Sequence, residues 1–399
     1  MHADTEIRMQ DNIKCRSCNS GNTRLIYSQN GFPVHSTLNM PTRGKAVKYP
    51  RGDIALFFCN KCGFIFNGKF DAGLLEYCSE CEETQGFSPT FNAFAGNLAE
   101  QLVGRYGLEN KSIIEIGCGK GEFLAKLCEL GGNRGMGFDP AFVEGRIESK
   151  AAERIRFIKD YYSEKYRDYH ADFICCRMTL EHIAKVGEFV WTIRKSIENR
   201  FDTILFLQVP DVTRILKECS FEDIYYEHCS YFSPGSLAGL LRRNGFDILD
   251  LYTGYQGQYL MVEARPTHGR LQDPGPLEDD LDTLKEYAST FEGRLERKLR
   301  SWKNSLEGKN GSRTVLWGAG SKAVAFMTSL RVADKIEYVV DINPHRQGTF
   351  LPGSGREIVS PAFLGEYDPQ RVIIMNPVYV DEIRQELDRL SLTPELLSL

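Results

Sequence analysis

The sequence predicts an α/β protein: a doubly wound sheet, preceded by a small metal-binding lobe and followed by a second, shorter α/β unit. Strand-like apolar runs alternate with helical stretches between residues 91 and 265, which is typical of a mostly parallel sheet. Three Cys-x-x-Cys pairs are confined to the first 81 residues, and a fresh strand with a glycine-rich turn begins after residue 313. We therefore expect a lobe (1–90), a central domain (91–265), a linker with a long helix (266–312) and a C-terminal domain (313–399).

Length and composition exclude several classes of protein. At roughly 100–200 residues per domain, 399 residues make two or three domains. The 49 basic and 54 acidic residues give a net charge of −5, which argues against a general nucleic-acid binder. The chain has no run of 18 apolar residues, so no membrane span is expected. The N-terminal segment MHADTEIRMQDN is too polar for a secretory signal, and we expect a cytoplasmic protein with reduced cysteines.

The first two cysteine pairs have the spacing of a metal site. Two residues between thiols let one tight turn present both sulfurs to a single ion, and two such turns complete a tetrahedral shell. We expect a structural zinc ion, with Gly63 supplying a positive φ after the second turn. The expected ligands are Cys15, Cys18, Cys59 and Cys62. Cys78 and Cys81 form a third pair, for which free thiols, a second metal site and a redox pair all stay open.

Short apolar runs bounded by turn residues give the expected strands. They are 54–58 and 64–66 in the lobe, 112–116, 134–138, 171–175 and 203–208 in the central domain, and 314–317, 336–340 and 372–375 in the C-terminal domain. A helix is expected over 122–130.

A long amphipathic helix is expected over 281–306, ended by Gly308. Its apolar residues recur at spacings of three and four. They are Leu281, Leu284, Ala288, Phe291, Leu295, Leu299, Trp302 and Leu306. We interpret the helix as a packed connector; a coiled-coil dimer arm is the alternative.

A glycine-rich loop follows the first strand of the central domain. Residues 113–121 read IIEIGCGKG, a buried strand that runs into G-x-G-x-G and then a helix. Glycines let the backbone approach a ligand closely, and Asp139, at the end of the next strand, is placed to accept hydrogen bonds from ribose hydroxyls. The residues expected to bind a cofactor here are Glu115, Gly117, Cys118, Gly119, Gly121, Asp139 and Pro140.

These motifs resemble those of class I S-adenosylmethionine-dependent methyltransferases. The E-x-G-x-G-x-G loop and the acid one strand later are that family's donor-binding motifs. The resemblance implies a class I methyltransferase sheet with S-adenosylmethionine as the cofactor. It also implies that Asp160 and Tyr161 flank the adenine and that Arg177 and Met178 lie beneath the donor.

Two segments with a histidine follow later strands of the same sheet. TLEHI places His182 after the fourth strand, and FEDIYYEH places His228 after the fifth strand and a short helix. Ligands of open α/β sheets bind beyond the carboxyl ends of the strands, where the glycine loop also lies. A lone histidine is more often structural, but two of only seven at this edge favour a functional role.

The order of the whole chain is similar to that of the nucleotide-sugar C-methyltransferases of the tetronitrose C-3 methyltransferase type. The shared features are the cysteine-pair lobe, a donor-binding domain with Tyr-x-Glu-His, and a C-terminal domain that opens with a glycine-rich strand–helix turn. The resemblance implies methylation at C-3 of a nucleoside-diphosphate 4-keto-6-deoxy sugar. It implies that His228 removes the proton beside the ketone, with Tyr225, Glu227 and His182 around the sugar.

That chemistry suits these side chains. Histidine titrates near 6.5, which is appropriate for a general base, and a proton beside a ketone is acidic enough for a positioned base to remove. The enolate places charge on the carbonyl oxygen, where the Tyr225 hydroxyl or an N–H of His182 would stabilise it.

The match to the family is loose in two places. The family's lobe supplies a tyrosine to the active site, for which Tyr77 is the candidate, and Gln85 is expected near the methionine end of the donor. The family's donor loop often carries Asn-Asp where this chain has Gly119 and Lys120.

The C-terminal domain begins with a dinucleotide-type fingerprint. GAGSKA fits G-x-G-x-x-A after a strand, and Asp341 follows about 20 residues later. About 85 residues supply only one half of a full dinucleotide fold, so we expect a half-Rossmann domain that, by the resemblance, holds the nucleotide part of the substrate; a bound nicotinamide cofactor is the alternative. The residues expected to bind substrate are Gly318, Gly320, Ser321, Lys322, Arg346 and Gln347. For the last two, plain turn chemistry is the alternative.

Two further functions stay open at this point. One is an O- or N-methyltransferase on another small molecule, which needs no carbon-acid base. The other is a zinc-lobe binding module whose methyltransferase domain is silent. The expected partner is a small nucleotide-sugar substrate, not nucleic acid or a membrane, and the sequence predicts no oligomeric state.

Overall fold

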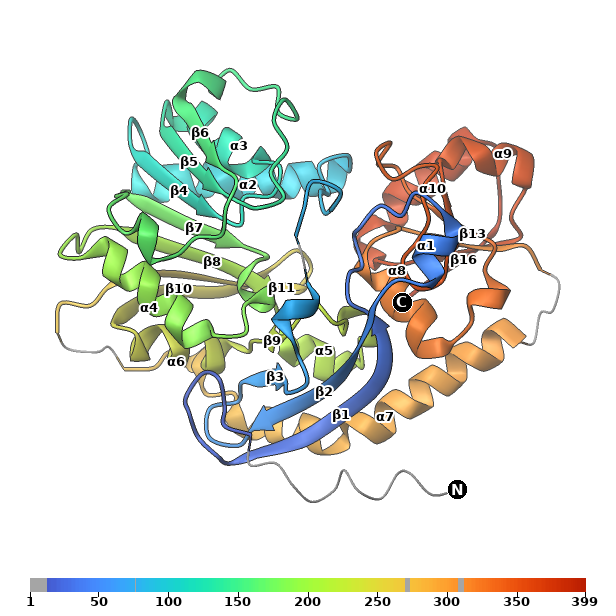
Figure 1. The fold of residues 1–399 in the computed structure, drawn as a ribbon, viewed down its shortest axis with the longest axis horizontal. Helices are drawn as coiled ribbons and strands as arrows, with labels where there is room; N and C mark the ends of the chain where they lie inside the picture. Colours follow the sequence, from blue (N-terminus) through green and yellow to red (C-terminus); the bar gives the residue numbers. More distant parts are fainter. Residues whose placement is uncertain (1–12, 76, 270–272, 308–311) are drawn as a thin grey trace.

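The computed structural model describes residues 13–75, 77–269, 273–307 and 312–399. The polar N-terminal segment and Gly308, the expected end of the long helix, lie outside these residues. In the part of the chain that is described, the strands form three sheets (Figure 1). None of the described helices combines the length and the apolar character that a bilayer crossing requires.

The lobe is built on a four-stranded antiparallel sheet. Its strands are β1 (Thr23–Pro33), β2 (Arg51–Cys59), β3 (Ile65–Asn67) and β9 (Ser230–Tyr231), in that order. Ile54, Leu56 and Phe58 alternate along β2 with their side chains buried, as expected of a strand with one face on a core. The edge strand β9 comes from the central domain, so the lobe sheet is completed by a segment far away in the sequence.

The central domain has a seven-stranded sheet in the order β10-β11-β8-β7-β4-β5-β6. Five strands are parallel and β11 is antiparallel to both of its neighbours. The strands are β4 (Ser112–Ile116), β5 (Arg134–Phe138), β6 (Ile155–Ile158), β7 (Phe173–Arg177), β8 (Ile204–Pro210), β10 (Phe246–Gly254) and β11 (Tyr259–Pro266). The helices are α2 (Pro89–Tyr106), α3 (Glu122–Gly131), α4 (Val186–Ile197), α5 (Val212–Glu218) and α6 (Pro234–Arg243). This arrangement confirms the predicted doubly wound fold class.

The expected strand at 171–175 is the clearest error in the central domain. β7 begins two residues later and continues to Arg177, whose backbone pairs with that of Gln208 on β8. A charged side chain such as that of Arg177 suggests a loop, but Arg177 is only 7% exposed. Its guanidinium donates a hydrogen bond to the Gln208 side chain and lies over the ring of Phe123.

The long helix α7 (Leu281–Glu307) buries its predicted apolar stripe within the chain. Leu284, Ala288, Phe291 and Leu295 are all buried, and α7 packs on β1, α5 and α8 (Ser321–Leu330). The connector interpretation therefore describes its packing in this chain.

The C-terminal domain has a five-stranded, wholly parallel sheet in the order β14-β13-β12-β15-β16. The strands are β12 (Thr314–Trp317), β13 (Tyr338–Val340), β14 (Glu357–Val359), β15 (Arg371–Ile374) and β16 (Glu395–Ser398), and the other helices are α9 (Leu364–Tyr367) and α10 (Val380–Arg389). The short strands β14 and β16 carry too weak a local signal to be predicted. The remaining short elements are α1 (Arg43–Val47) and the 3₁₀ turns η1 (Ala72–Leu74), η2 (Ala152–Arg154), η3 (Glu164–Tyr166), η4 (Leu180–His182), η5 (Phe221–Asp223), η6 (Pro276–Glu278), η7 (Ala333–Lys335), η8 (Pro361–Phe363) and η9 (Pro377–Tyr379).

Candidate functional site

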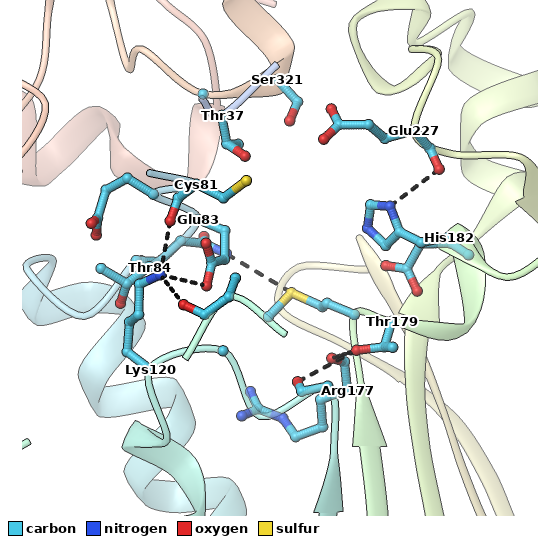
Figure 2. Close-up of a pocket in the computed structure, with 18 of the residues that line it drawn as sticks. Thr37, Cys81, Glu83, Thr84, Lys120, Arg177, Thr179, His182, Glu227 and Ser321 are labelled. Atoms are coloured by element: carbon cyan, nitrogen blue, oxygen red, sulfur yellow. Dashed lines mark hydrogen bonds and ion pairs between the residues drawn. The ribbon is translucent and has the colours of Figure 1, made fainter. Parts of the chain in front are cut away.

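The lobe, the central domain and the C-terminal domain together enclose a cavity of about 620 Å³. Figure 2 shows Lys120 and Cys81 on one side of it, with His182 and Glu227 on the other. Of the residues predicted to bind cofactor or substrate or to act in catalysis, all but Gly121 and Gln347 line this cavity. Gly121 lies before α3 with φ +86°, and the Gln347 amide donates to the Asp341 carbonyl within its own loop. Both therefore shape loops and do not face the cavity.

The glycine loop after β4 is shaped for close approach to a ligand. Gly117 has φ +70°, and a Cβ there would lie 2.0 Å from the hydroxyl oxygen of Thr179. A Cβ at Gly121 would lie 2.5 Å from the ring of Phe157. No other residue type fits either position without displacing its neighbours, so this loop can take a cofactor against its backbone.

Two carboxyl groups flank the loop, of which Glu115 is buried and Asp139 is half-buried. Asp139 accepts hydrogen bonds from the backbone N–H of Gly119 at 2.8 Å and of Ala141 at 2.7 Å, one on each oxygen. A carboxylate has about four lone-pair sites, so it can still accept from ribose hydroxyls. Glu115 accepts from the backbone N–H of Leu124 at 3.0 Å, and burial raises the pKa of this carboxyl to about 8.

Arg177 and Met178 form the floor of the cavity at the end of β7. The Arg177 guanidinium lies 3.8 Å from the centre of the Phe123 ring, and its Nη2 is buried with no partner among the described residues. Nη2 is therefore available to an anionic ligand group. Met178 has φ +48°, which is an uncommon backbone conformation for a residue with a side chain. The Met178 sulfur lies 3.9 Å from the side-chain amide nitrogen of Gln85.

Asp160 and Tyr161 lie at a more open part of the same cavity. Asp160 accepts from the hydroxyl of Tyr166 at 2.5 Å and pairs with Lys165, and Tyr161 is 55% exposed. Tyr161 can therefore cover a flat ligand group at the surface.

His228 is buried in the wall opposite the glycine loop. Its Nε2 lies 2.5 Å from the hydroxyl of Tyr225 and 4.0 Å from a carboxyl oxygen of Glu181. Burial, together with the nearby His182 and Lys322, lowers the pKa of His228 well below the usual value, so the ring is neutral. Burial raises the pKa of the Glu181 carboxyl to about 8, so that group is also mostly uncharged at neutral pH.

His182 lies beside His228, with ring centres 4.9 Å apart. Its Nδ1 is 3.1 Å from the Glu227 carbonyl oxygen and 3.0 Å from the Tyr77 hydroxyl. A carbonyl oxygen can only accept, so Nδ1 carries the proton and the neutral ring presents Nε2 as an acceptor. In this tautomer the phenol hydroxyls are the better donors to an enolate, and the N–H donation expected of His182 stays a prediction.

The ligand-type atoms of Glu181, His182 and His228 lie within 4.8 Å of one another. Within this group, His182 Nδ1 contacts the Tyr77 hydroxyl and the Glu227 carbonyl oxygen, and His228 Nε2 contacts the Tyr225 hydroxyl.

The Glu227 carboxylate is held by the lobe. It accepts from His35 Nδ1 and from the backbone N–H of Ser36, both at 2.9 Å, and from the Ser36 hydroxyl. Although burial opposes ionisation, these donors hold the pKa of Glu227 below its usual range. The Ser36 hydroxyl also lies 2.7 Å from that of Ser321 in the C-terminal domain.

The C-terminal domain contributes cationic groups. The amino end of α8, with Gly318, Gly320 and Ser321, faces the cavity, and Lys322 pairs there with Asp223. Arg346 is 4% exposed, and its Nε and Nη2 have no partner among the described residues. A buried guanidinium with two free donor atoms is suited to an anion.

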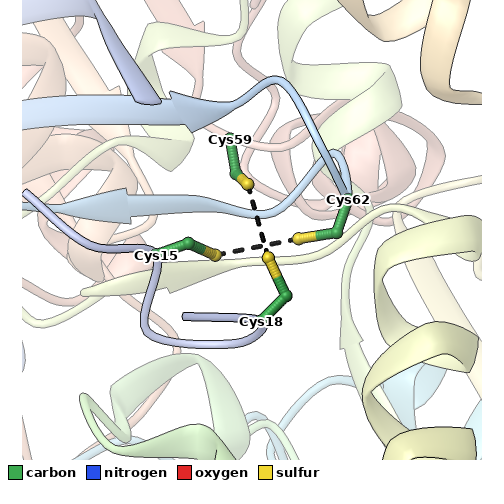
Figure 3. A group of neighbouring side chains, drawn as sticks. All are labelled: Cys15, Cys18, Cys59 and Cys62. Carbon is green, nitrogen blue, oxygen red and sulfur yellow. Dashed lines mark hydrogen bonds between the residues drawn. The ribbon is translucent and has the colours of Figure 1, made fainter. Parts of the chain in front are cut away.

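The first two cysteine pairs meet in the lobe (Figure 3). Cys15 and Cys62 have their sulfurs 3.7 Å apart, Cys18 and Cys59 3.6 Å apart, and all four sulfurs lie within 4.8 Å of one another. A tetrahedron with metal–sulfur bonds of about 2.3 Å has edges of about 3.8 Å, so the cluster has the dimensions of a zinc centre. Gly63 has φ +74°, as predicted.

The third cysteine pair has no comparable surroundings. Cys81 is buried in the cavity wall and Cys78 is half-buried, with its backbone N–H 3.5 Å from the Cys81 sulfur. Among the described residues, no further ligand-type side chain joins them to make a set of three. Burial raises the pKa of the Cys81 thiol, so it stays protonated and unreactive.

Several residues of the site carry no local signal in the sequence. His35, Ser36, Glu82 and Glu181 are buried polar residues that contact the site or line it. His35, Ser36 and Glu82 belong to no spaced motif, and only the fold brings them to the cavity. Glu181 differs because it precedes His182 in TLEHI, and Lys120, which also lines the cavity, stands in the glycine loop.

Comparisons with known proteins agree with this geometry. Residues 91–251 match the family model described as "Methyltransferase domain", and residues 277–392 match the one described as "C-methyltransferase C-terminal domain". The chain is 26% identical over 305 residues to C-methyltransferase NovU of Streptomyces niveus, across 72% of this chain and 71% of that one.

Solved structures resemble the chain more distantly. The riboflavin-analogue dimethyltransferase RosA of Streptomyces davawensis is 19% identical to this chain, with a TM-score of 0.36. The match covers 44% of this chain and 56% of RosA. Magnesium protoporphyrin IX methyltransferase of Synechocystis is 17% identical over 45% of this chain and 84% of its own, with a TM-score of 0.34.

The loop geometry predicts the effect of a single methyl group. We expect Gly117→Ala to weaken binding of S-adenosylhomocysteine roughly 5- to 100-fold, since overpacking of this kind costs about 1–3 kcal/mol. Isothermal titration calorimetry measures this affinity. Gly96→Ala in α2, where a Cβ meets nothing within 4 Å, is the matched control and should bind as the unmodified protein does. Equal affinity of the two variants would contradict the assignment of the loop.

Proposed function

We propose that this chain is an S-adenosylmethionine-dependent C-methyltransferase and that it methylates C-3 of a nucleoside-diphosphate 4-keto-6-deoxy sugar, supported by the two matching family models and the similarity to C-methyltransferase NovU. The observation that carries the proposal is that His228, the glycine loop and Arg346 all line one cavity. A base, a donor loop and an anion-binding group thus face a common space. The bound donor supplies an electrophilic methyl group on a sulfonium, so the task left to the chain is to make a carbon nucleophile.

His228 is the proposed general base. Its imidazole is neutral because it is buried and faces positively charged or protonatable neighbours, which leaves a lone pair to accept a proton. The C-3–H bond of the sugar would break, with its proton passing to the ring and its electron pair into an enolate. The enolate carbon would then bond to the methyl group while the methyl–sulfur bond of the donor breaks, so that the donor leaves as the neutral thioether S-adenosylhomocysteine. Nε2 is the proposed acceptor, since it faces Tyr225 and Glu181 at the cavity wall.

Hydroxyl groups near His228 are proposed to stabilise the enolate, and a carboxylate is proposed to orient the sugar. Tyr225 and Tyr77 present phenol hydroxyls, and burial raises the pKa of both well above the usual value, so they remain donors. Losing one donor to an oxyanion typically costs about 3 kcal/mol of the barrier. Glu227, fixed by the lobe, is proposed to accept a hydrogen bond from a sugar hydroxyl.

The C-terminal domain is proposed to hold the nucleoside diphosphate. Arg346 lines the cavity and has two buried donor atoms with no partner among the described residues, and the amino end of α8 presents Ser321 and Lys322. Helix amino ends and guanidinium groups both favour phosphate oxygens. Gln347 faces its own loop and is left out of this contact set.

We propose that the four-cysteine cluster holds a structural zinc ion. Cys15, Cys18, Cys59 and Cys62 would fill all four positions, leaving none for a substrate. The cluster lies between the first strands of the lobe, away from the cavity lining. Its expected contribution is therefore to the folding of the lobe.

The first test separates a carbon acceptor from an oxygen or nitrogen acceptor. In deuterated water with S-adenosylhomocysteine, we expect the protein to exchange deuterium into C-3 of a 4-keto-6-deoxy sugar nucleotide from a panel. His228→Asn should slow this exchange by about 10²–10⁴-fold, the typical contribution of a general base. NMR of the sugar measures the exchange. His268→Ala, an exposed histidine that stacks on Phe201 outside the cavity, is the control. Methyl transfer with no exchange, unaffected by His228→Asn, would contradict the proposal.

The second test uses the pH dependence. A base must be neutral to act, and protonation removes activity as the pH falls. Since the pKa of His228 is depressed, activity should persist below pH 6.5, the value of an ordinary histidine. The acid limb of the kcat/KM profile reports this pKa for the free enzyme. An acid limb above 6.5 would show that another group, or a differently charged His228, governs the reaction.

The third test concerns the metal. We expect atomic emission to find one equivalent of zinc per purified chain. Cys59→Ser should lower the zinc content, and it should lower the free energy of unfolding by more than about 4 kcal/mol. Cys78→Ser should keep one equivalent, because no set of three ligands includes it among the described residues. Two equivalents in the unmodified protein, falling to one in Cys78→Ser, would place a second ion at the third pair.

A further inference from the structure

Residues 77–88, here called the strap, pass from the lobe to α2 between the central and C-terminal domains. In Figure 1 the strap is the blue trace that rises to the start of α2. It is fixed to the lobe by backbone hydrogen bonds, from Asn39 to Glu80 at 3.2 Å and from Glu82 to Thr37 at 3.0 Å. Its side chains line the cavity from Cys81 to Gln85.

One side of the strap is bound to the central domain. Lys120, in the glycine loop and 3% exposed, donates to the Cys81 carbonyl oxygen at 2.8 Å and to that of Ala141 at 3.0 Å. The Arg146 guanidinium holds both carboxylate oxygens of Glu82, at 3.0 and 3.1 Å. Movement of the glycine loop or of the segment around Arg146 therefore acts directly on the strap.

The other side of the strap is bound to the C-terminal domain through the same residue. The Asn343 amide donates to a Glu82 carboxylate oxygen at 3.1 Å, and Arg346 Nη1 donates to the Glu82 carbonyl oxygen at 3.1 Å. Glu82, Asn343 and Arg346 are all less than 5% exposed. Loss of Arg146 would leave the buried Glu82 charge without a counter-ion, and loss of Asn343 would remove a hydrogen bond from it, so separating the two sides costs free energy.

We propose that Glu82 is a positioning residue that couples donor binding at the glycine loop to nucleotide binding at the 341–347 loop. The nucleotide half of this statement rests on the proposed function. A ligand bound at the glycine loop fixes the position of the strap, and the strap then holds the 341–347 loop. A ligand bound at the 341–347 loop acts on the glycine loop in the same way. Such coupling is reciprocal, and typical values alter each affinity about 5- to 150-fold.

Hydrogen–deuterium exchange with S-adenosylhomocysteine alone tests the coupling without any acceptor. In the unmodified protein we expect added protection in the glycine loop, in the strap and in residues 341–347. In Glu82→Ala, which removes the contacts with both Arg146 and Asn343, protection of the glycine loop should remain while that of 341–347 disappears. The proposal is overturned if 341–347 gains no protection in the unmodified protein, or if Glu82→Ala retains it.

A negative charge added at position 343 distinguishes a positioning role of Glu82 from a merely structural one. Asn343→Asp keeps the acceptor that serves the backbone N–H of His345 but sets a second carboxylate against Glu82, so it should abolish the coupling. Adding Glu82→Gln to it supplies an amide donor between the two side chains and should restore the coupling. Glu80→Gln, an exposed carboxylate of the same strap, is the matched control. Failure of the double variant to recover any protection of 341–347 would count against a direct role of this contact.

Calorimetry with nucleotides completes the test. The affinity for S-adenosylhomocysteine should rise roughly tenfold in the presence of the nucleoside diphosphate that binds from a panel of UDP, dTDP, GDP, CDP and ADP. The rise should vanish in Glu82→Ala, which has no side-chain acceptor for Arg146 or Asn343. If no nucleotide of the panel binds, the proposed acceptor class fails, whereas the exchange experiment still decides the coupling.

Discussion

One hydrophobic core joins the three parts of the chain, and the cavity exists because of it. Ile54 of the lobe sheet, Ile215 of α5, Phe291 of α7 and Phe326 of α8 belong to the same buried cluster. Burying one such side chain contributes about 1.5–3 kcal/mol, so parting the lobe from its neighbours would cost many times that amount. The donor loop, the histidines and the cationic groups therefore keep their relative positions through apolar packing that lies beside them.

Exclusion of water then fixes the charge state of the polar groups. Burial keeps His228 neutral and Glu181 protonated, whereas Glu227 stays ionised because His35 and Ser36 donate to it. Neighbouring groups of similar burial thus have different charges, and the difference comes from their hydrogen-bond partners. For groups buried in this way, each of these interactions is also stronger than it would be in bulk water.

The sequence predicts those features whose signals are local. The bounds of β4, β5 and β12 follow from their apolar runs, and the positive φ of Gly63 follows from the cysteine turn. Distant contacts leave no such trace: His35 lies 192 residues from Glu227, and no spacing rule connects them. The predicted end of β7 is wrong for a related reason. The charge of Arg177 suggests a loop, but its guanidinium donates a hydrogen bond to the Gln208 side chain, and the strand continues to Arg177.

The strand β9 ties the proposed base to the lobe sheet. Ser230 pairs with Phe66 of β3, and the backbone N–H of Asn67 donates to the Cys229 carbonyl oxygen at 3.0 Å, next to His228 in the chain. The lobe is thus not an independent module that evolution or an engineer could exchange by cutting at residue 90. A functional chimaera would have to inherit the 225–231 segment together with its lobe, because a foreign edge strand would change the register in which the imidazole is presented.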